Sequence, residues 1–251
     1  MNLKTLLKAK TNFFKLMFNV DKLLATQNEV LLISKENEWA NIYHDSIRGK
    51  DSIEKLPLNI GRWAGNYSFF YVLNRILSDY KPNRILELGL GESSKFISTY
   101  IDNYLLESKH WILEHDIEWI NAFNNKFSLS KRSEILKCSL ITKEIKGHQT
   151  YFYDDFEDKI FDKFDLYIID GPFGSERFSR YNIISIVERF TVKDEFIIIM
   201  DDTNRKGEND TKNDIISLLK DKKIVFYIGE YRGFKNVTLI STGKYKFSTT
   251  F

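Results

Sequence analysis

Two glycines and a nearby acid mark the segment of this chain that is best suited to hold a small ligand. The segment is Arg84-Ile-Leu-Glu-Leu-Gly-Leu-Gly-Glu-Ser-Ser-Lys95, an apolar run that carries Glu87 and breaks into Gly89-Leu90-Gly91. Paired glycines let the backbone turn sharply and approach a ligand closely, and we expect Ser93 and Ser94 to cap the helix that follows. Because a helix N-terminus presents free amides, the pattern predicts a nucleotide-type cofactor site.

Carboxylates end three further apolar runs along the chain. Glu114 ends the run from Trp111, and Asp170 ends the run from Phe164. An acid at the tip of a second strand accepts hydrogen bonds from ribose hydroxyls in several nucleoside-binding folds, so Glu114 predicts a nucleoside but not a particular one. Asp201 and Asp202 end the third run, which begins at Glu195.

The last three of these acids are expected to meet. The carboxyl ends of parallel strands open into one crevice, so Asp170, Asp201 and Asp202 should converge beside the glycine loop. Three carboxylates repel one another unless something positive joins them. A hard divalent cation such as Mg²⁺, which takes oxygen ligands, is the simplest candidate.

The order Glu87-x-Gly89-x-Gly91 resembles the first motif of class I S-adenosylmethionine-dependent methyltransferases. A dinucleotide-binding loop prefers glycine or alanine where this chain has Ser94, and it gains nothing from an acid inside the first strand. The resemblance covers about three quarters of the chain. It extends to metal-dependent O-methyltransferases of small molecules and sugars, which carry an acid after the fourth strand and an acid pair after the fifth. It also extends to methyltransferase-like proteins of bacterial surface-polysaccharide pathways.

The resemblance implies site residues as well as a fold. It implies S-adenosylmethionine as cofactor, with Mg²⁺ as an additional one. The cofactor residues would be Glu87, Gly89, Gly91, Ser93 and Glu114, and the metal ligands would be Asp170, Asp201 and Asp202. In that family the metal holds two neighbouring substrate hydroxyls and lowers the pKa of the one to be methylated.

One departure from the family concerns the catalytic base. Catechol-type enzymes place a lysine three residues after the first metal acid, and this chain has Phe173 there. If no metal binds, Asp170 or Asp202 could itself be the general base, because a carboxylate crowded by its neighbours has a raised pKa. These two acids are therefore the catalytic candidates.

Three arginines are candidates for substrate binding. Arg177 and Arg180 lie in the glycine- and arginine-rich stretch 171–181, which would suit a mobile cover over an anionic or polyhydroxyl substrate. Arg62 lies in the irregular stretch 57–68, which is either a loop anchored by a buried Trp63 or a cover that stacks on a sugar ring. All three arginines could equally be surface residues.

The elements that must position these residues predict an α/β domain over residues 56–251. We expect a Rossmann-like, doubly wound and mostly parallel sheet, with further strands near 135–138, 224–228 and 237–241 and a helix over 208–220. The last two strands would form a hairpin around Gly229 and Gly233. An antiparallel final strand of this kind is typical of methyltransferase sheets and differs from the purely parallel dinucleotide sheet.

Residues 1–55 are predicted to be a separate helical extension. Residues 1–18 hold four lysines and no acid, together with an apolar face. Such a face either lies on an anionic membrane or packs on the catalytic domain or on a second subunit. No stretch is long and apolar enough to span a bilayer, and the lysines interrupt any signal-peptide core. We therefore expect a cytoplasmic protein, with peripheral contact to the inner face of the membrane as an open alternative.

Composition narrows the function classes. A net charge of +2 is too small to predict a nucleic-acid partner, and the lone Cys138 excludes an intramolecular disulfide. We therefore expect a methyltransferase that acts on a hydroxyl of a sugar or sugar-containing small molecule. Two alternatives stay open: a metal-dependent glycosyltransferase, in which Asp201 and Asp202 hold a nucleotide sugar through a cation, and a catalytically inactive methyltransferase fold that serves as a binding subunit.

Overall fold

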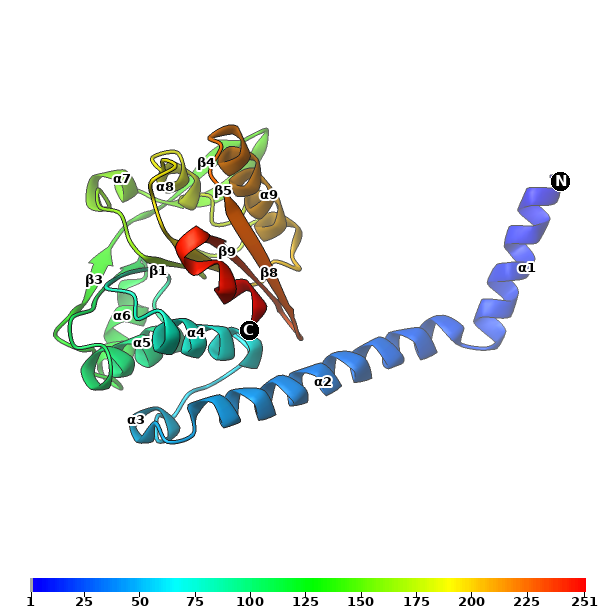
Figure 1. Ribbon diagram of the computed structural model, residues 1–251. Helices are drawn as coiled ribbons and strands as arrows, with labels where there is room; N and C mark the ends of the chain where they lie inside the picture. The colour runs from blue at the N-terminus through cyan, green and yellow to red at the C-terminus, as the bar shows by residue number, and fades with distance from the viewer. Residues whose placement is uncertain (1) are drawn as a thin grey trace.

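A seven-stranded sheet forms the centre of the protein, seen in a computed structural model that describes residues 2–251 (Figure 1). The strand order is β3-β2-β1-β6-β7-β9-β8. The strands are β1 (Arg84–Leu88), β2 (Lys109–Glu114), β3 (Ser133–Lys137), β6 (Leu166–Ile169), β7 (Ile197–Met200), β8 (Phe226–Arg232) and β9 (Asn236–Thr242).

The direction of the strands confirms the predicted fold. β1 pairs in parallel with β2 and β6, β2 with β3, and β6 with β7. β9, the final strand, runs antiparallel to both β7 and β8. The sheet is therefore Rossmann-like and mostly parallel, with an antiparallel last strand. The predicted hairpin is present, but Gly229 lies inside β8, and the turn falls at residues 233–235.

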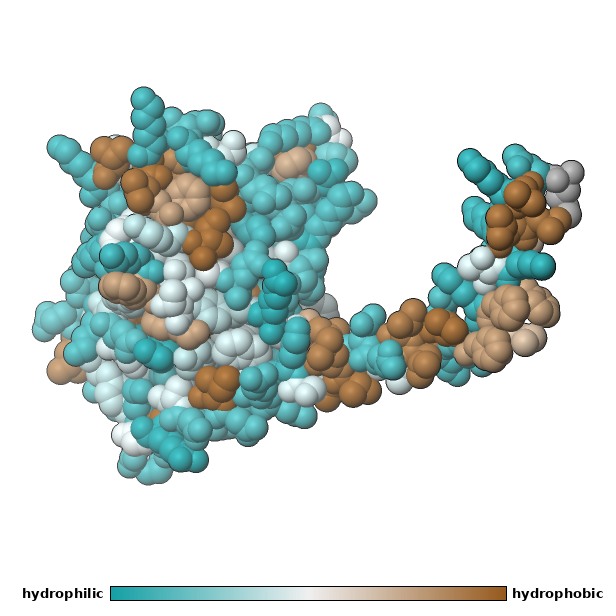
Figure 2. All heavy atoms as spheres, turned by 45° about the vertical axis from the view of Figure 1, so that its right-hand side comes forward, coloured by the Kyte–Doolittle hydropathy of each residue, from teal (hydrophilic) through white to brown (hydrophobic). Residues whose placement is uncertain are grey.

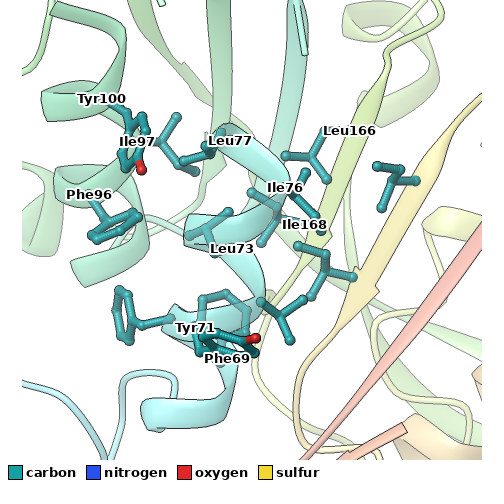
Figure 3. Packing of buried hydrophobic residues seen from close by; sticks show 14 of the residues in the cluster. Phe69, Tyr71, Leu73, Ile76, Leu77, Phe96, Ile97, Tyr100, Leu166 and Ile168 are labelled. Atoms are coloured by element: carbon teal, nitrogen blue, oxygen red, sulfur yellow. The ribbon is translucent and has the colours of Figure 1, made fainter. Parts of the chain in front are cut away.

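Helices cover both faces of the sheet because successive strand residues point to opposite faces and the central strands are apolar on both. Ile85 and Ile168 pack in one core cluster, while Leu86 and Ile169 pack in another. The first core contains side chains of α4 (Tyr67–Asp79) and α5 (Glu92–Asn103), as Figure 3 shows. The second contains side chains of α8 (Ile183–Val187) and α9 (Lys206–Asp221), and α6 (Ile117–Asn124) packs beside Ile112 of β2.

A second, two-stranded sheet was not predicted. β4 (Leu140–Ile145) and β5 (His148–Tyr153) pair antiparallel to each other and lead through α7 (Phe156–Lys159) to β6. The side chain of Asn182 fixes the end of this hairpin, since Oδ1 accepts from the Tyr153 amide at 3.0 Å and Nδ2 donates to the Tyr153 carbonyl at 3.1 Å. Because it lies between β3 and β6 in the chain, the hairpin takes the place where a doubly wound fold normally has a helix.

The amino-terminal segment is helical, as predicted, but part of it belongs to the body. It comprises α1 (Leu3–Met17), α2 (Val20–Ile47) and α3 (Asp51–Glu54). Tyr43, Ile47 and Ile53 are buried in the first core. Trp39 Nε1 donates to the Arg232 carbonyl at 3.0 Å. The predicted boundary at residue 55 therefore falls within packed structure. Met1, the first residue of the predicted extension, lies outside the described residues.

The rest of α2 and all of α1 project from the body (Figure 1). Glu36 hydrogen-bonds the end of this projecting part to the body. Its Oε1 accepts from the Tyr67 amide at 2.9 Å, and its Oε2 accepts from the Phe234 amide at 3.2 Å. Within residues 2–251, no helix combines the length and the apolar character that crossing a membrane requires. The chain closes with a 3₁₀ segment, η1 (Gly243–Thr250), which packs beside β8 and β9.

Two alanine variants of α2 test where the body begins. Tyr43→Ala should lower the free energy of unfolding by about 3 kcal/mol, because it removes an aromatic ring from the core. Leu24→Ala, on the projecting half of the same helix, should change it by less than about 0.5 kcal/mol. Urea unfolding measures both. Equal effects of the two variants would show that α2 does not dock on the body as described.

Candidate active site

The glycine loop lies where β1 ends, and its two glycines have different roles. Gly89 has φ +101°, and a Cβ added to it would lie 3.2 Å from the backbone nitrogen of Gly171. The backbone itself therefore requires glycine at this position. Gly91 is the N-cap of α5, and no described atom outside its chain neighbours lies within 4 Å of an added Cβ. The second glycine leaves open space beside a helix N-terminus.

Glu87 lies beneath this loop and is closed off from solvent. Its side chain is fully buried, and its oxygens accept from the hydroxyls of Ser93 and Ser94, the latter at 2.7 Å. His110 Nε2 lies 3.0 Å from the same carboxylate. Ser94 Oγ also accepts from the Gly91 amide at 3.0 Å. Of the two serines expected to cap α5, Ser94 therefore bonds to the N-cap residue Gly91, whereas Ser93 turns its hydroxyl to Glu87.

Glu114 lies at the tip of β2 and binds the glycine loop directly. Oε2 accepts from the Leu90 amide at 3.0 Å, and Oε1 accepts from the amides of His115 and Asp116 at 2.7 and 3.0 Å. Trp119 Nε1 donates to the Leu90 carbonyl at 2.7 Å. The acid predicted beside the nucleoside is thus held against the loop by backbone amides.

The three aspartates meet as predicted. Asp170 follows β6, Asp201 and Asp202 follow β7, and one carboxylate oxygen from each lies within 4.8 Å of the others. Their exposure differs: the side chain of Asp170 is 19% exposed, whereas those of Asp201 and Asp202 are 0% and 3% exposed. Water, and hence a substrate, reaches only Asp170 to any extent.

Protein cations lie within ion-pair distance of the acids. Arg180 Nη2 lies 3.0 Å from Asp170 Oδ1 and 3.0 Å from Asp202 Oδ2, and Nη1 donates to the Asp201 carbonyl at 3.1 Å. Lys235 Nζ lies 3.5 Å from both Asp201 Oδ2 and Asp202 Oδ1. Arg180, expected to bind substrate, is therefore buried as a counter-ion of the acids.

The cluster includes two more charged residues, from the start of α9. Glu208 is buried and lies 3.8 Å from Arg180, and Arg205 Nη1 lies 2.9 Å from Asp202 Oδ2. Arg180 and Asp202 both have positive φ, +58° and +61°, a backbone region that costs non-glycine residues about 1–3 kcal/mol and is common at functional sites. Tertiary contacts must hold both residues there.

The net charge of this cluster sets its acidity. Four carboxylates face three cations, which leaves one negative charge in excess. Burial, together with the carboxylates of Asp201 and Asp202, raises the pKa of Asp170 to about 7 against the opposing effect of Arg180. Burial and Asp202 likewise raise the pKa of Asp201 to about 6. The cluster therefore takes up a proton as the pH falls through about 7, first at Asp170.

Lys235 and Glu208 were not chosen as site residues from the sequence. Glu208 stands at the start of the helix predicted over 208–220, where an acid can equally be a helix-start charge, and no motif marks Lys235. A signal existed for Lys235, because it directly precedes β9, and the start of an antiparallel strand beside β7 lies at the carboxyl end of β7. A register for the hairpin would have placed it beside Asp201.

The other two substrate arginines lie apart from the acids. Arg177 pairs with Asp210 of α9, whereas Arg62 is exposed. The loop that carries Arg62 is fixed at both ends: the Asn59 amide donates to Glu92 Oε2 at 3.1 Å, and the Ala64 carbonyl accepts from Lys235 Nζ at 2.9 Å. This covering loop (residues 59–64) thus links the start of α5 to the acid cluster.

Trp63 corrects one expectation about the covering loop. The sequence allows a loop anchored by a buried Trp63, but the side chain is 96% exposed. The loop is therefore held by its backbone contacts at Asn59 and Ala64, and the indole ring is free to contact a ligand.

Comparison with known proteins supports the fold. No protein-family model matches this sequence, and no curated protein matches it. The structure is similar to that of the O-methyltransferase TomG from Streptomyces achromogenes in complex with SAM, at 13% identity over 82% of this chain and 89% of that chain, with a TM-score of 0.50.

Two other solved structures are similar at lower scores. SAH-bound methyltransferase PaMTH1 from Podospora anserina is 14% identical over 87% of this chain and 96% of that chain, with a TM-score of 0.45. Cofactor-bound Rv0187 from MTB is 12% identical over 80% and 89%, with a TM-score of 0.47. At such identities the likeness to TomG establishes the fold alone, and the activity of this chain has to be argued from its own site.

The glycine loop yields a paired prediction. Gly91→Val should leave the thermal midpoint nearly unchanged and weaken S-adenosylhomocysteine binding at least 100-fold, because the new side chain enters open space beside the loop. Gly89→Ala should instead lower the midpoint, since positive φ and the contact with Gly171 oppose a Cβ. Calorimetric titration and thermal unfolding measure the two effects. Unchanged affinity in folded Gly91→Val would remove the loop from the site.

Proposed function

We propose that this protein is an S-adenosylmethionine-dependent O-methyltransferase that acts on a hydroxyl of a sugar or sugar-containing small molecule. The observation that carries the proposal is the sheet: antiparallel β9 lies between β7 and β8, and the glycine loop lies at the carboxyl end of β1. A parallel dinucleotide sheet lacks such a strand. Gly91 leaves room for the cofactor, Glu114 would lie beside its ribose, and Glu87 would hold the loop in place through Ser93 and Ser94.

The acid cluster fits Mg²⁺ poorly. Arg180 and Lys235 already supply the positive charge for which a metal was expected. A divalent cation would turn one excess negative charge into one excess positive charge beside a buried guanidinium. Mg²⁺ also keeps several of its waters, and Asp201 and Asp202 are too deeply buried to leave room for them. We therefore assign no step to a metal.

Asp170 has the properties of a general base. It is the most exposed carboxylate of the three, and a pKa of about 7 matches the pH at which a base works best. When bound, S-adenosylmethionine would supply an electrophilic methyl group on sulfur. Asp170 would accept the proton of the substrate hydroxyl. The hydroxyl oxygen would at the same time bond to the methyl carbon as the carbon–sulfur bond breaks. Arg180 and Lys235 would keep the remaining acids ionised.

The covering loop supports a polyhydroxyl acceptor. The exposed indole of Trp63 offers an apolar face, and the loop lies between the start of α5 and the acid cluster. A sugar ring presents C–H groups on one face and hydroxyls at its rim, so it could stack on Trp63 and direct a hydroxyl towards Asp170. Arg62, next to Trp63, is exposed and could bind an acidic substituent.

Titration of the protein with S-adenosylhomocysteine, with and without Mg²⁺, tests the proposal. We expect micromolar binding that Mg²⁺ and EDTA change by less than about twofold, because no metal ligand lies in the cofactor loop. Binding of a nucleoside diphosphate sugar in place of S-adenosylhomocysteine would support the glycosyltransferase alternative. Binding without methyl transfer to any of a panel of sugars and nucleotide sugars would support the inactive binding subunit.

Measurement of turnover tests separately whether methyl transfer depends on Mg²⁺. Once a sugar acceptor is found, methyl transfer should be the same in EDTA and in millimolar Mg²⁺, because protein cations already offset all but one of the four carboxylate charges. A loss of activity in EDTA that Mg²⁺ restores would return Asp170, Asp201 and Asp202 to the role of metal ligands.

Asp170→Asn should reduce turnover by about 10²–10⁴-fold and leave S-adenosylhomocysteine affinity within about twofold. The fold should persist, since the variant leaves three carboxylates with three cations. In the wild type, turnover should rise with pH and level off above about 7, because protonated Asp170 accepts no proton. Asp221→Asn, on the exposed end of α9, is the matched control. Full activity of Asp170→Asn would make the cluster purely structural.

A further inference from the structure

The apolar face of α1 has no partner in the described chain. None of the α1 side chains, all of which the structure describes, is buried. Figure 2 shows hydrophobic residues gathered along the projecting arm, apart from the body. The exposed large apolar residues of α1 and its C-cap are Leu3, Leu6, Leu7, Phe13, Phe14, Leu16, Met17 and Phe18. An uncovered apolar surface of this extent marks an interaction site.

The charges of α1 indicate the kind of partner. Lys4, Lys8 and Lys15 share one side of the helix at spacings of four and seven residues, next to the apolar side. Lys10 lies among the apolar side chains. Its methylene groups could pack against them while the ammonium group stays at the edge of the apolar face, in water. With no acid in residues 1–18, the helix presents only positive charge around its apolar face.

The two protein partners that could cover this face fit it less well. The body of the same chain lies at the other end of α2: residues 20–35 project before Glu36 docks, and 16 residues of helix span about 24 Å. A second copy of α1 would bring the lysines of two helices together. The projecting half of α2 carries acids as well as lysines, so it lacks the one-sided charge of α1.

We propose that α1 binds flat on the surface of an anionic lipid bilayer. Its 15 residues span only about 22 Å, less than the roughly 30 Å of a hydrocarbon core, so the helix would lie in the interface with Phe13, Phe14 and Met17 inserted. The lysines would contact anionic headgroups, and α2 would hold the body away from the surface. Lipid binding of α1 is independent of the reaction that the body performs.

Vesicle co-sedimentation of the full chain tests the proposal. We expect binding to phosphatidylcholine vesicles that contain phosphatidylglycerol, at least tenfold weaker binding to phosphatidylcholine alone, and weakening in high salt. Lys4→Glu with Lys8→Glu should reduce binding about 30-fold or more, given the contribution of each lysine near an anionic surface. The matched control is Lys126→Glu with Lys131→Glu, which makes the same change of charge on the exposed surface of the body.

An apolar pair completes the design. Phe13→Ser with Phe14→Ser should abolish binding, whereas Phe161→Ser with Phe247→Ser, two phenylalanines of the body that are at least as exposed, should not. Unchanged thermal midpoints would show that all variants are folded. The proposal fails if the wild type does not bind anionic vesicles, or if both phenylalanine pairs behave alike. Light scattering covers the remaining outcome. If the wild type is a dimer that Phe13→Ser with Phe14→Ser dissociates, and the wild type does not bind vesicles, the apolar face joins two copies of the chain and the proposal fails.

Discussion

A cluster of buried charges constrains this structure more than any other interaction. Taking a charged side chain out of water costs several kcal/mol, and opposite charges offset that cost only when they are held close together. Here Arg180 contacts Asp170 and Asp202, which follow two different strands, and Lys235 reaches Asp201 and Asp202 from a hairpin turn. Each segment thus depends on the others, because removing one charge would leave its partner buried and uncompensated. The positive φ of Arg180 and Asp202 is the local cost of this arrangement.

The glycine loop is joined to this cluster by direct backbone contact. Gly171 follows Asp170, and a Cβ on Gly171 would lie 2.8 Å from Gly89 Cα. No side chain can separate the end of β1 from the end of β6 at that point. The space beside Gly91 and the exposed edge of Asp170 are therefore held at a fixed separation by the sheet itself. Such fixed placement is what a transfer between a bound cofactor and an acceptor requires.

The sequence predicted what depends on local patterns. Apolar runs that end in acids gave the parallel strands, and the acids converged because parallel strands end at one edge. The β4–β5 hairpin was missed although its strands pair with each other across Lys146-Gly147, because its alternation of apolar and charged residues is weak. The counter-ions of the acids were missed for a related reason. Arg180 was expected either to bind substrate or to lie at the surface, and only tertiary packing brings it and Lys235 beside the carboxylates.

The projecting arm meets the body at Glu36 of α2. Glu36 ends the projecting part of α2, and its two oxygens accept from the amides of Tyr67 and Phe234. Tyr67 begins α4, directly after the segment that carries the covering loop, and Phe234 precedes Lys235 in the β8–β9 turn. The root of the arm therefore contacts the two segments that Lys235 joins at the acid cluster. Trp39, Tyr43 and Ile47 of the same helix pack on the body beyond Glu36, so the root of the arm is held by core packing as well as by hydrogen bonds.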